Sequence, residues 1–465
     1  MKLNDTIAAI ATPRGVGGIA IIRISGEKSV EIAEKTVKPA DGTKLSEICE
    51  RVLTLCRIYE DKDLKMLIDR ALAAVMYAPR SYTGETVVEI NCHGGYFVAE
   101  KILDSLLKNG ARLAEAGEFT RRAVINGKTN LLEAEAVIDL INSTSELGLH
   151  NAALSVNGCL TEKVSALRER VMNMASHISA AADYPEEVDV PEKQELINEL
   201  KATGNGIEEL ISGYDTGRIL RDGVRTAIVG KPNVGKSSVL NALLKSERAI
   251  VTDIPGTTRD TVEETVNIGG ISLRLIDTAG IREASDSIEK MGIEKSVQNI
   301  KDATLCLFVI DSSDGLGDED RKIAEYLKEK KTVVILNKTD KSQVTNEQEF
   351  EKALGFKPSA FVKTSVAAGG EAFGIDTLEA TISDVMLAEK IDTESVYISN
   401  ERQRDALYKA KDALSEALEG FINGVPYDLL YIGLEDTLSA LGEVTGETVR
   451  EEICDRVFER FCVGK

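Results

Sequence analysis

Residues 226–244 read TAIVGKPNVGKSSVLNALL, and this stretch sets the fold of the middle of the chain. A short β-prone run leads directly into the loop GKPNVGKS (230–237), and a helical pattern follows it. The glycines let backbone N–H groups wrap around phosphate oxygens, Lys236 neutralises the β and γ oxygens, and the Ser237 hydroxyl can bind Mg²⁺. This strand–loop–helix arrangement predicts a P-loop that holds a nucleoside triphosphate.

The next elements along the chain indicate which base is bound. The tetrapeptide DTAG (277–280) follows a β-prone run, so Asp277 is expected in the Mg²⁺ shell and the Gly280 N–H can sense a γ-phosphate. NKTD (337–340) follows a later strand, and its Asp340 carboxylate can accept hydrogen bonds from guanine N1–H and the exocyclic amine. Adenine does not present these donors together, so such a site would penalise ATP. The order of these elements predicts a GTPase.

Further stretches complete the expected nucleotide site. GTTRD (256–260) occupies the switch I position, and TSVA (364–367) departs from the usual Ser-Ala-Lys pattern of a guanine-closing loop. The expected Mg²⁺ ligands are Ser237 and Thr258. The residues expected to contact GTP are Asn233, Val234, Gly235, Lys236, Ser237, Ser238, Thr252, Asp253, Ile254, Pro255, Gly256, Thr257, Thr258, Asp277, Thr278, Ala279, Gly280, Asn337, Lys338, Asp340 and Ser365.

The hydrolytic machinery departs from that of Ras-like enzymes. Ile281 follows DTAG, where those enzymes place a glutamine, and an isoleucine cannot orient the attacking water. Arg259 and Arg282 are candidates for an arginine finger, but a reading as solvated switch residues explains them at least as well.

Patterns outside the P-loop predict a multidomain chain. Residues 1–120 mix strands (19–24 and 86–90) with a helix over 96–109, which is typical of a small α+β domain. Residues 121–217 and 383–465 show helical periodicity, interrupted by an acidic, proline-marked bend at 183–191. Residues 218–382 alternate strands and helices, which favours a doubly wound parallel sheet. We therefore expect a Ras-like α/β GTPase domain inserted in an all-α domain, behind an N-terminal α+β domain.

Composition limits the environment and the partners. The chain has 465 residues, a formal net charge of −21, seven scattered cysteines and three histidines. No signal-peptide pattern, membrane-spanning run or zinc spacing is present, which predicts a cytoplasmic protein with reduced thiols and no membrane contact. An acidic surface repels phosphate backbones, although the tract 112–128 is slightly basic. Contact with nucleic acid is expected to be local or to come through a partner.

Several stretches resemble one known family. They are DTIAAIATP (5–13), SYTGE (81–85), EINCHGG (89–95), GEFT (117–120), TDIPGTTRD (252–260) and the terminal FCVGK (461–465). Together they resemble the tRNA-modification GTPases of the MnmE (TrmE) type over essentially the whole chain.

The resemblance implies a homodimer that works with a FAD-containing partner of the MnmG type. Such complexes modify C5 of the wobble uridine (position 34) of certain tRNAs, with a tetrahydrofolate derivative in its 5-formyl or methylene form supplying the one-carbon unit. tRNA is expected to be held mainly through the partner. By motif position, the folate contacts would be Arg23, Glu89, Lys128 and the terminal Lys465. Taken without the family, Arg23 and Lys128 are expected to be surface charges, and Glu89 an exposed strand residue.

The same resemblance implies a potassium ion in place of an arginine finger. By position, the ion would be held by Asn233, Thr252, Ile254 and Thr257, and the water-positioning glutamate would be Glu289. A fixed cation can stabilise the charge that develops on the phosphates. The expected catalytic residues are then Glu289, Lys236 and Gly280. Cys462 is either a functional thiol near the folate or a small buried hydrophobe.

Two alternatives remain at this level. A regulatory GTP-binding switch, such as a ribosome-assembly GTPase, would share the nucleotide motifs but would not need residues 1–120. A binding scaffold with a decayed nucleotide site is disfavoured, because Lys236, Ser237, Asp277 and Asp340 are all present.

Overall fold

The computed structural model describes residues 5–13, 15–183, 192–246, 264–276, 298–314, 316–341, 347–366, 372–387, 391–392, 394–448, 457–459, 461 and 463–464. The chain divides into two compact units. The first comprises Met1–Ile138, Val164–Ser179 and Tyr431–Lys465, and the second comprises Asp139–Lys163 and Ala180–Leu430. Each unit is described by itself.

A seven-stranded sheet forms the N-terminal part of the first unit, in the order β3-β4-β5-β6-β2-β1-β7. The strands are β1 (Ile7–Ile10), β2 (Ile19–Ser25), β3 (Val37–Pro39), β4 (Thr54–Tyr59), β5 (Leu67–Met76), β6 (Val87–His93) and β7 (Arg112–Leu113). Helices α1 (Ser29–Glu34), α2 (Tyr96–Lys108) and α3 (Glu118–Ile125) and the short 3₁₀ helix η1 (Leu45–Glu47) accompany them. The strands predicted at 19–24 and 86–90 and the helix at 96–109 are confirmed, whereas the other strands were not predicted.

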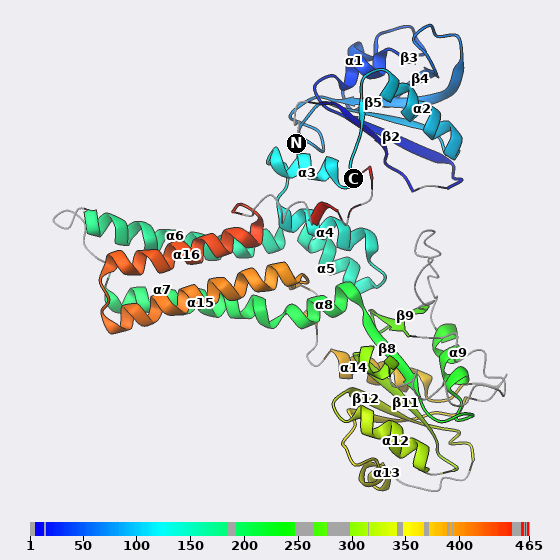
Figure 1. Cartoon of the computed structure of the whole chain (residues 1–465), viewed down its shortest axis with the longest axis vertical. Coiled ribbons are helices and arrows are strands. Elements are labelled where there is room, and N and C mark those ends of the chain that lie inside the picture. The colour runs from blue at the N-terminus through cyan, green and yellow to red at the C-terminus, as the bar shows by residue number, and fades with distance from the viewer. Residues whose placement is uncertain are drawn as a thin grey trace. The chain divides into compact units, whose positions relative to one another are not determined.

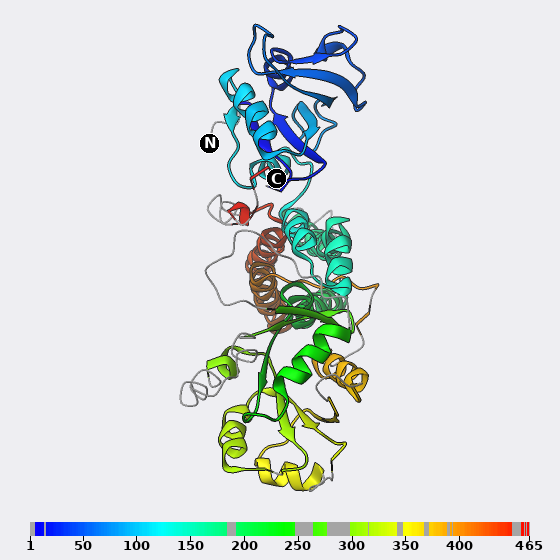
Figure 2. The ribbon, with the colours of Figure 1, turned by 90° about the vertical axis from the view of Figure 1, so that its right-hand side faces the viewer.

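Helix α2 covers one face of this sheet (Figure 2). Side chains alternate across a strand, so every second residue of β2, β5 and β6 points toward α2. Ile22, Ile24, Val75 and Ile90 are fully buried there against Ile102 and Leu106 of α2. The opposite face therefore carries the remaining residues of each strand, among them the predicted Arg23 and Glu89.

The all-α part consists of long amphipathic helices. They are α4 (Leu131–Asn142), α5 (Glu146–Val156), α6 (Cys159–Asp183), α7 (Lys193–Ser212), α8 (Tyr214–Asp222), α15 (Glu401–Asn423) and α16 (Tyr427–Thr445). Side-chain caps begin two of them: Asn130 Oδ1 accepts the Glu133 N–H at 2.9 Å, and Asn400 and Gln403 form a capping box. Helices α7 and α15 lie side by side (Figure 1), and the apolar face of α15 is buried.

A six-stranded sheet forms the core of the inserted domain, in the order β13-β12-β11-β8-β10-β9. Its strands are β8 (Val224–Val229), β9 (Glu264–Ile268), β10 (Ile271–Leu275), β11 (Leu305–Asp311), β12 (Lys331–Asn337) and β13 (Ala360–Lys363). Helices α9 (Lys236–Ser246) and α14 (Ile375–Met386) pack in one apolar cluster of the sheet, and α12 (Asp318–Leu327) and α13 (Glu347–Leu354) pack in the other. The predicted doubly wound arrangement is thus confirmed.

One edge strand of this sheet, β9, was not predicted. Strand β9 pairs antiparallel with β10, while the other described pairings of this sheet are parallel. Gly269 and Gly270 join the two strands with φ of +56° and +83°, the left-handed values that a tight two-residue hairpin needs. The Gly-Gly pair between two short β-prone runs was the available signal.

The fold class expected from the sequence is confirmed. The chain combines an N-terminal α+β domain, an all-α domain and an inserted α/β domain of the P-loop type. The detailed boundaries at 120, 217 and 382 stay a prediction, and α3 runs across the first of them.

Candidate functional site: a guanine nucleotide site and a second polar site

The P-loop lies between the end of β8 and the start of α9. Gly230 and Gly235 have φ of +148° and +102°, values that other residues rarely adopt. A Cβ on Gly230 would overlap the Val309 carbonyl, and a Cβ on Gly235 would overlap the amide nitrogen of Asn337. Only glycine therefore permits this loop to lie so close to β11 and β12.

Lys236 stands at the centre of the loop without an anionic partner. Its Nζ donates to the carbonyl oxygens of Gly230 and Lys231, each at 2.8 Å. Burial lowers the pKa of Lys236, and the more distant Asp320 only partly opposes that shift. Within the described chain no carboxylate comes close enough to form an ion pair with it. A desolvated ammonium of this kind is suited to an incoming phosphate.

The predicted guanine element lies at the same edge of the sheet. Asn337 donates through Nδ2 to the Val234 carbonyl at 2.9 Å, and its Oδ1 accepts the Thr364 hydroxyl at 3.1 Å. Asp340 Oδ1 accepts the Ser365 hydroxyl at 2.6 Å, which lowers the pKa of Asp340. The structure thus brings the P-loop, the NKTD stretch and Ser365 together and keeps Asp340 ionised as a hydrogen-bond acceptor.

Asp311 is a part of this site that the sequence did not indicate. It ends β11, between the strands that carry the two motifs, and its Oδ2 accepts Lys338 Nζ at 2.7 Å. Lys338 Nζ also donates to the Asn233 carbonyl at 2.7 Å. Burial raises the pKa of Asp311, but hydrogen bonds from Lys338 and Ser313 outweigh it and lower that pKa to about 2. The position at the carboxyl end of a buried strand was the available signal.

A second polar site lies on the N-terminal sheet, where Arg23 and Glu89 face each other across β2 and β6. Arg23 Nε and Nη2 both lie 2.8 Å from Glu89 Oε1. The Arg23 guanidinium also lies between two rings, 5.3 Å from the Tyr82 centroid and 5.6 Å from that of Phe119. The expectation of a surface charge is therefore wrong for Arg23, because strand register and the two rings enclose it.

Two other segments lie nearby, one against the Tyr82 loop and one beside Arg23. The Lys128 stem lies over Gly84 of the loop that carries Tyr82. Val463 pairs with Ala116, and the Gly464 carbonyl is 3.5 Å from Arg23 Nη1, so the C-terminal tail ends beside Arg23. At the start of α3, Gly117 has φ +65°, and a Cβ there would overlap Phe458 and Phe461 of the tail segment.

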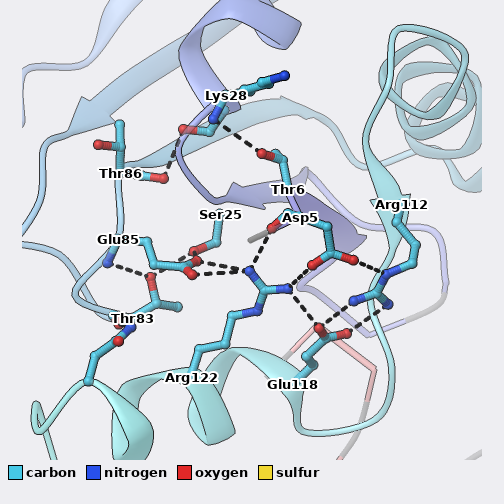
Figure 3. Close-up of polar contacts among 12 residues, drawn as sticks. Asp5, Thr6, Ser25, Lys28, Thr83, Glu85, Thr86, Arg112, Glu118 and Arg122 are labelled. Atoms are coloured by element: carbon cyan, nitrogen blue, oxygen red, sulfur yellow. Dashed lines mark hydrogen bonds and ion pairs between the residues drawn. The ribbon is translucent and has the colours of Figure 1, made fainter. Parts of the chain in front are cut away.

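A buried ionic network holds α3 against the sheet (Figure 3). The fully buried Arg122 contacts three carboxylates: Asp5 at 2.6 Å, Glu118 at 2.9 Å and Glu85 at 3.1 Å. Arg112 joins Asp5 and Glu118 from the edge, each at 2.6 Å. Arg122 and Phe119 belong to the same short helix, so the network also fixes one of the rings that enclose Arg23.

This network involves two arginines of the slightly basic tract 112–128. Arg122 is 0% exposed, and Arg112 is paired with carboxylates. Burial raises the pKa of Glu118 and of Asp5, but hydrogen bonds from Arg112 and other donors outweigh it and lower both. The two arginines are neutralised within the domain and are not free to contact phosphates.

Many predicted residues lie outside the described part of the chain. They are Glu289, Gly280, Thr252, Asp253, Ile254, Pro255, Gly256, Thr257, Thr258, Asp277, Thr278, Ala279, Cys462 and Lys465, together with Arg259, Ile281 and Arg282. The roles assigned to them stay predictions. Val234, Ser237 and Ser238 are described and lie where the P-loop enters α9.

Comparison with known proteins decides the family. The family described as the MnmE helical domain matches residues 131–462, and the one described as the GTP-binding protein TrmE N-terminus matches residues 6–128. The tRNA modification GTPases MnmE of Clostridioides difficile (strain 630) and Carboxydothermus hydrogenoformans are each 43% identical to the chain and align over 100% of both proteins. The chain belongs to the MnmE family of tRNA modification GTPases. Its activity is the hydrolysis of GTP.

Among solved structures, the G domain of the T. maritima FeoB iron transporter is 28% identical and covers 35% of this chain and 98% of its own, with a TM-score of 0.25. No described helix of this MnmE family member is long and apolar enough to cross a membrane. Across the described residues, no three His, Cys, Asp or Glu side chains group in a way that could hold a metal ion.

Proposed function

We propose that GTP hydrolysis by this chain is stimulated by potassium and drives a conformational change in a complex that modifies C5 of uridine 34 in certain tRNAs. The one-carbon unit would come from a tetrahydrofolate derivative, and a FAD-dependent partner of the MnmG type would complete the chemistry. The observation that supports the proposal is that Lys236 lacks a carboxylate partner in the P-loop, while the NKTD stretch, with an ionised Asp340, packs against the same loop, in a chain of the MnmE family. The four domains would be residues 1–120, 121–217, 218–382 and 383–465.

The nucleotide site would hold two metal ions of different roles. Mg²⁺ would bind the hydroxyls of Ser237 and Thr258, and it would neutralise charge on the β and γ oxygens. K⁺ would bind near Asn233, with Thr252, Ile254 and Thr257 as the other ligands of the ion. Asn233 has a φ of +63°, and its carbonyl accepts a hydrogen bond from Lys338 Nζ. Glu289 would position water, because Ile281 cannot.

Potassium dependence is tested by steady-state turnover of the full chain at equal ionic strength in KCl and in NaCl. We expect at least about tenfold faster hydrolysis in KCl, in line with the effect of removing one stabilising charge. Equal rates in the two salts would refute the role of the ion.

The N-terminal sheet would bind the reduced folate. Its ligands would be the paired Arg23 and Glu89, Lys128, whose stem contacts Gly84, and Lys465, which follows Gly464 beside Arg23. An ion pair next to the Tyr82 ring offers donors, acceptors and a flat stacking surface to a pterin. Cys462 would be a functional thiol close to the same ligand. The N-terminal domain would also join two chains in a homodimer.

The partner would supply most contacts to tRNA. The net charge of −21 and the internal neutralisation of Arg112 and Arg122 both argue for this arrangement. Because the substrate is tRNA, we place the protein in the cytoplasm.

Reconstitution tests the whole proposal. The full chain, an MnmG-type FAD protein, a methylene-tetrahydrofolate, GTP and unmodified tRNA are combined, and uridine 34 is analysed by mass spectrometry. We expect a mass gain at uridine 34 that requires GTP and disappears with a non-hydrolysable analogue. Hydrolysis of GTP without any modified uridine would favour a regulatory GTP switch instead.

A further inference from the structure

The face of the N-terminal sheet that points away from α2 is ordered in three cross-strand rows. Strand pairing places Ala74, Glu89 and Arg23 in one row and Leu55, Leu72, Asn91 and Ile21 in the next. The third row holds Lys38, Arg57 and Arg70 on β3, β4 and β5. The face thus changes from an ion pair, through an apolar row, to a basic row.

The basic row lacks counter-charges. Arg57 and Arg70 are exposed and directly opposite each other, a pairing of like charges that destabilises a sheet. Neither forms an ion pair with any residue the structure describes. The nearest acid in sequence, Asp69, hydrogen-bonds to His93, whose Nδ1 lies 2.7 Å from it, and forms no ion pair with Arg70. Paired arginines without carboxylates, in a chain of net charge −21, indicate a site for an external anion.

The spacing of the rows indicates how long the anion is and where its polar and apolar groups lie. Ala74, level with Glu89, and Arg70 are four positions apart along β5, which is about 13 Å at the rise of a strand. Between them Leu55 and Leu72 are 41% and 38% exposed and form an apolar step. A ligand that fits carries a hydrogen-bonding ring at one end, an apolar ring in the middle and carboxylates at the other end.

We propose that Arg57 and Arg70, with Lys38 beside them, bind the glutamyl carboxylates of a reduced folate and favour its γ-polyglutamate form. This assignment rests on the proposed folate site at Arg23 and Glu89. The aminobenzoyl ring lies over Leu55 and Leu72, and each added glutamate brings one more carboxylate to the basic row.

The test compares the affinity of the full chain for 5-formyltetrahydrofolate as monoglutamate and as γ-linked triglutamate, at low salt. We expect the triglutamate to bind at least about tenfold more tightly, and this preference to shrink as salt screens the charges. The double variant R57A/R70A is expected to reduce the preference to about twofold or less, and R57K/R70K to keep part of it.

Two controls distinguish a loss of ligand recognition from misfolding and from a general loss of positive charge. Lys108→Ala removes an exposed cation from α2, which packs on the opposite face of the sheet. We expect it to leave the preference for the triglutamate unchanged. GTP hydrolysis reports that each variant is folded. Equal wild-type affinities for the two ligands, or a preference that survives R57A/R70A, overturn the polyglutamate assignment and leave the folate site standing. No saturable binding of either ligand by the wild type overturns both.

Discussion

Two half-buried or buried cations, Lys236 in the P-loop and Arg122 in α3, differ in what surrounds them. Lys236 donates only to the carbonyls of Gly230 and Lys231, and burial lowers its pKa. Arg122 is enclosed by the carboxylates of Asp5, Glu85 and Glu118. The same rule applies to both: a charge removed from water needs a partner. The difference teaches that the cation lacking a carboxylate awaits a ligand, whereas the satisfied one organises the fold.

The largest effect is expected from Asp340→Asn, which alters the acceptor that reads guanine. A site built to hydrogen-bond a group of its ligand rejects a ligand that lacks the matching group by about 10⁴-fold. We expect the ratio of kcat/KM for GTP to that for XTP to fall by roughly this factor. Unchanged guanine selectivity would remove Asp340 from the base site.

Next in size is Lys236→Ala, which removes the charge held for the phosphates. We expect kcat/KM for GTP to fall by about 10²–10³-fold. Lys231→Ala is the matched control: its ammonium faces Asp314 and Asp320 at 3.4 and 3.8 Å, so its loss should cost far less. Similar losses in the two variants would contradict the special role given to Lys236.

Arg122→Met tests the role of the cation that is already paired with carboxylates. It leaves Glu85 without a cation and Asp5 and Glu118 with Arg112 alone, and breaking a buried ion pair on one side costs about 3–5 kcal/mol of unfolding free energy. Denaturant unfolding of the full chain, followed by tyrosine fluorescence, measures the loss. Arg112→Met, at the exposed edge of the network, should cost clearly less.

The smallest effect is a loss of stability in acid. The pKa values of Asp5 and Glu118 are lowered in the folded chain, so the unfolded state binds more protons as the pH falls. Their contribution is complete above the ordinary carboxyl pKa of about 4 and is lost as the pH drops through the lower folded values. Thermal unfolding between pH 6 and 3 should show this decline, and it should be weaker in Arg122→Met.

Sequence reasoning reached the guanine site because its parts are contiguous motifs at the ends of strands. GKPNVGKS and NKTD each carry their own chemistry, and parallel strands bring their ends to one edge. Asp311 was missed because a single aspartate after a strand carries no motif.

The network around Arg122 could not be predicted from the sequence. Asp5 is 117 residues from Arg122, and Glu85 is 37 residues away, so only the folded sheet brings them together. For the same reason the sequence could not show that Arg112 and Arg122, in the slightly basic tract 112–128, are neutralised within the domain. The rows on the sheet face likewise depend on strand register, which the sequence pattern left open.

The most direct test of the account measures GTP hydrolysis and binding of 5-formyltetrahydrofolate on the same preparations of wild type, Lys236→Ala and Arg122→Lys. The account predicts a crossed result: Lys236→Ala loses hydrolysis and keeps folate affinity, while Arg122→Lys keeps hydrolysis and loses folate affinity. Arg122→Lys keeps the charge but cannot reach three carboxylates at once, so α3 and the Phe119 ring should lose their position. Loss of both activities in either variant, or folate affinity unchanged in Arg122→Lys, would contradict it.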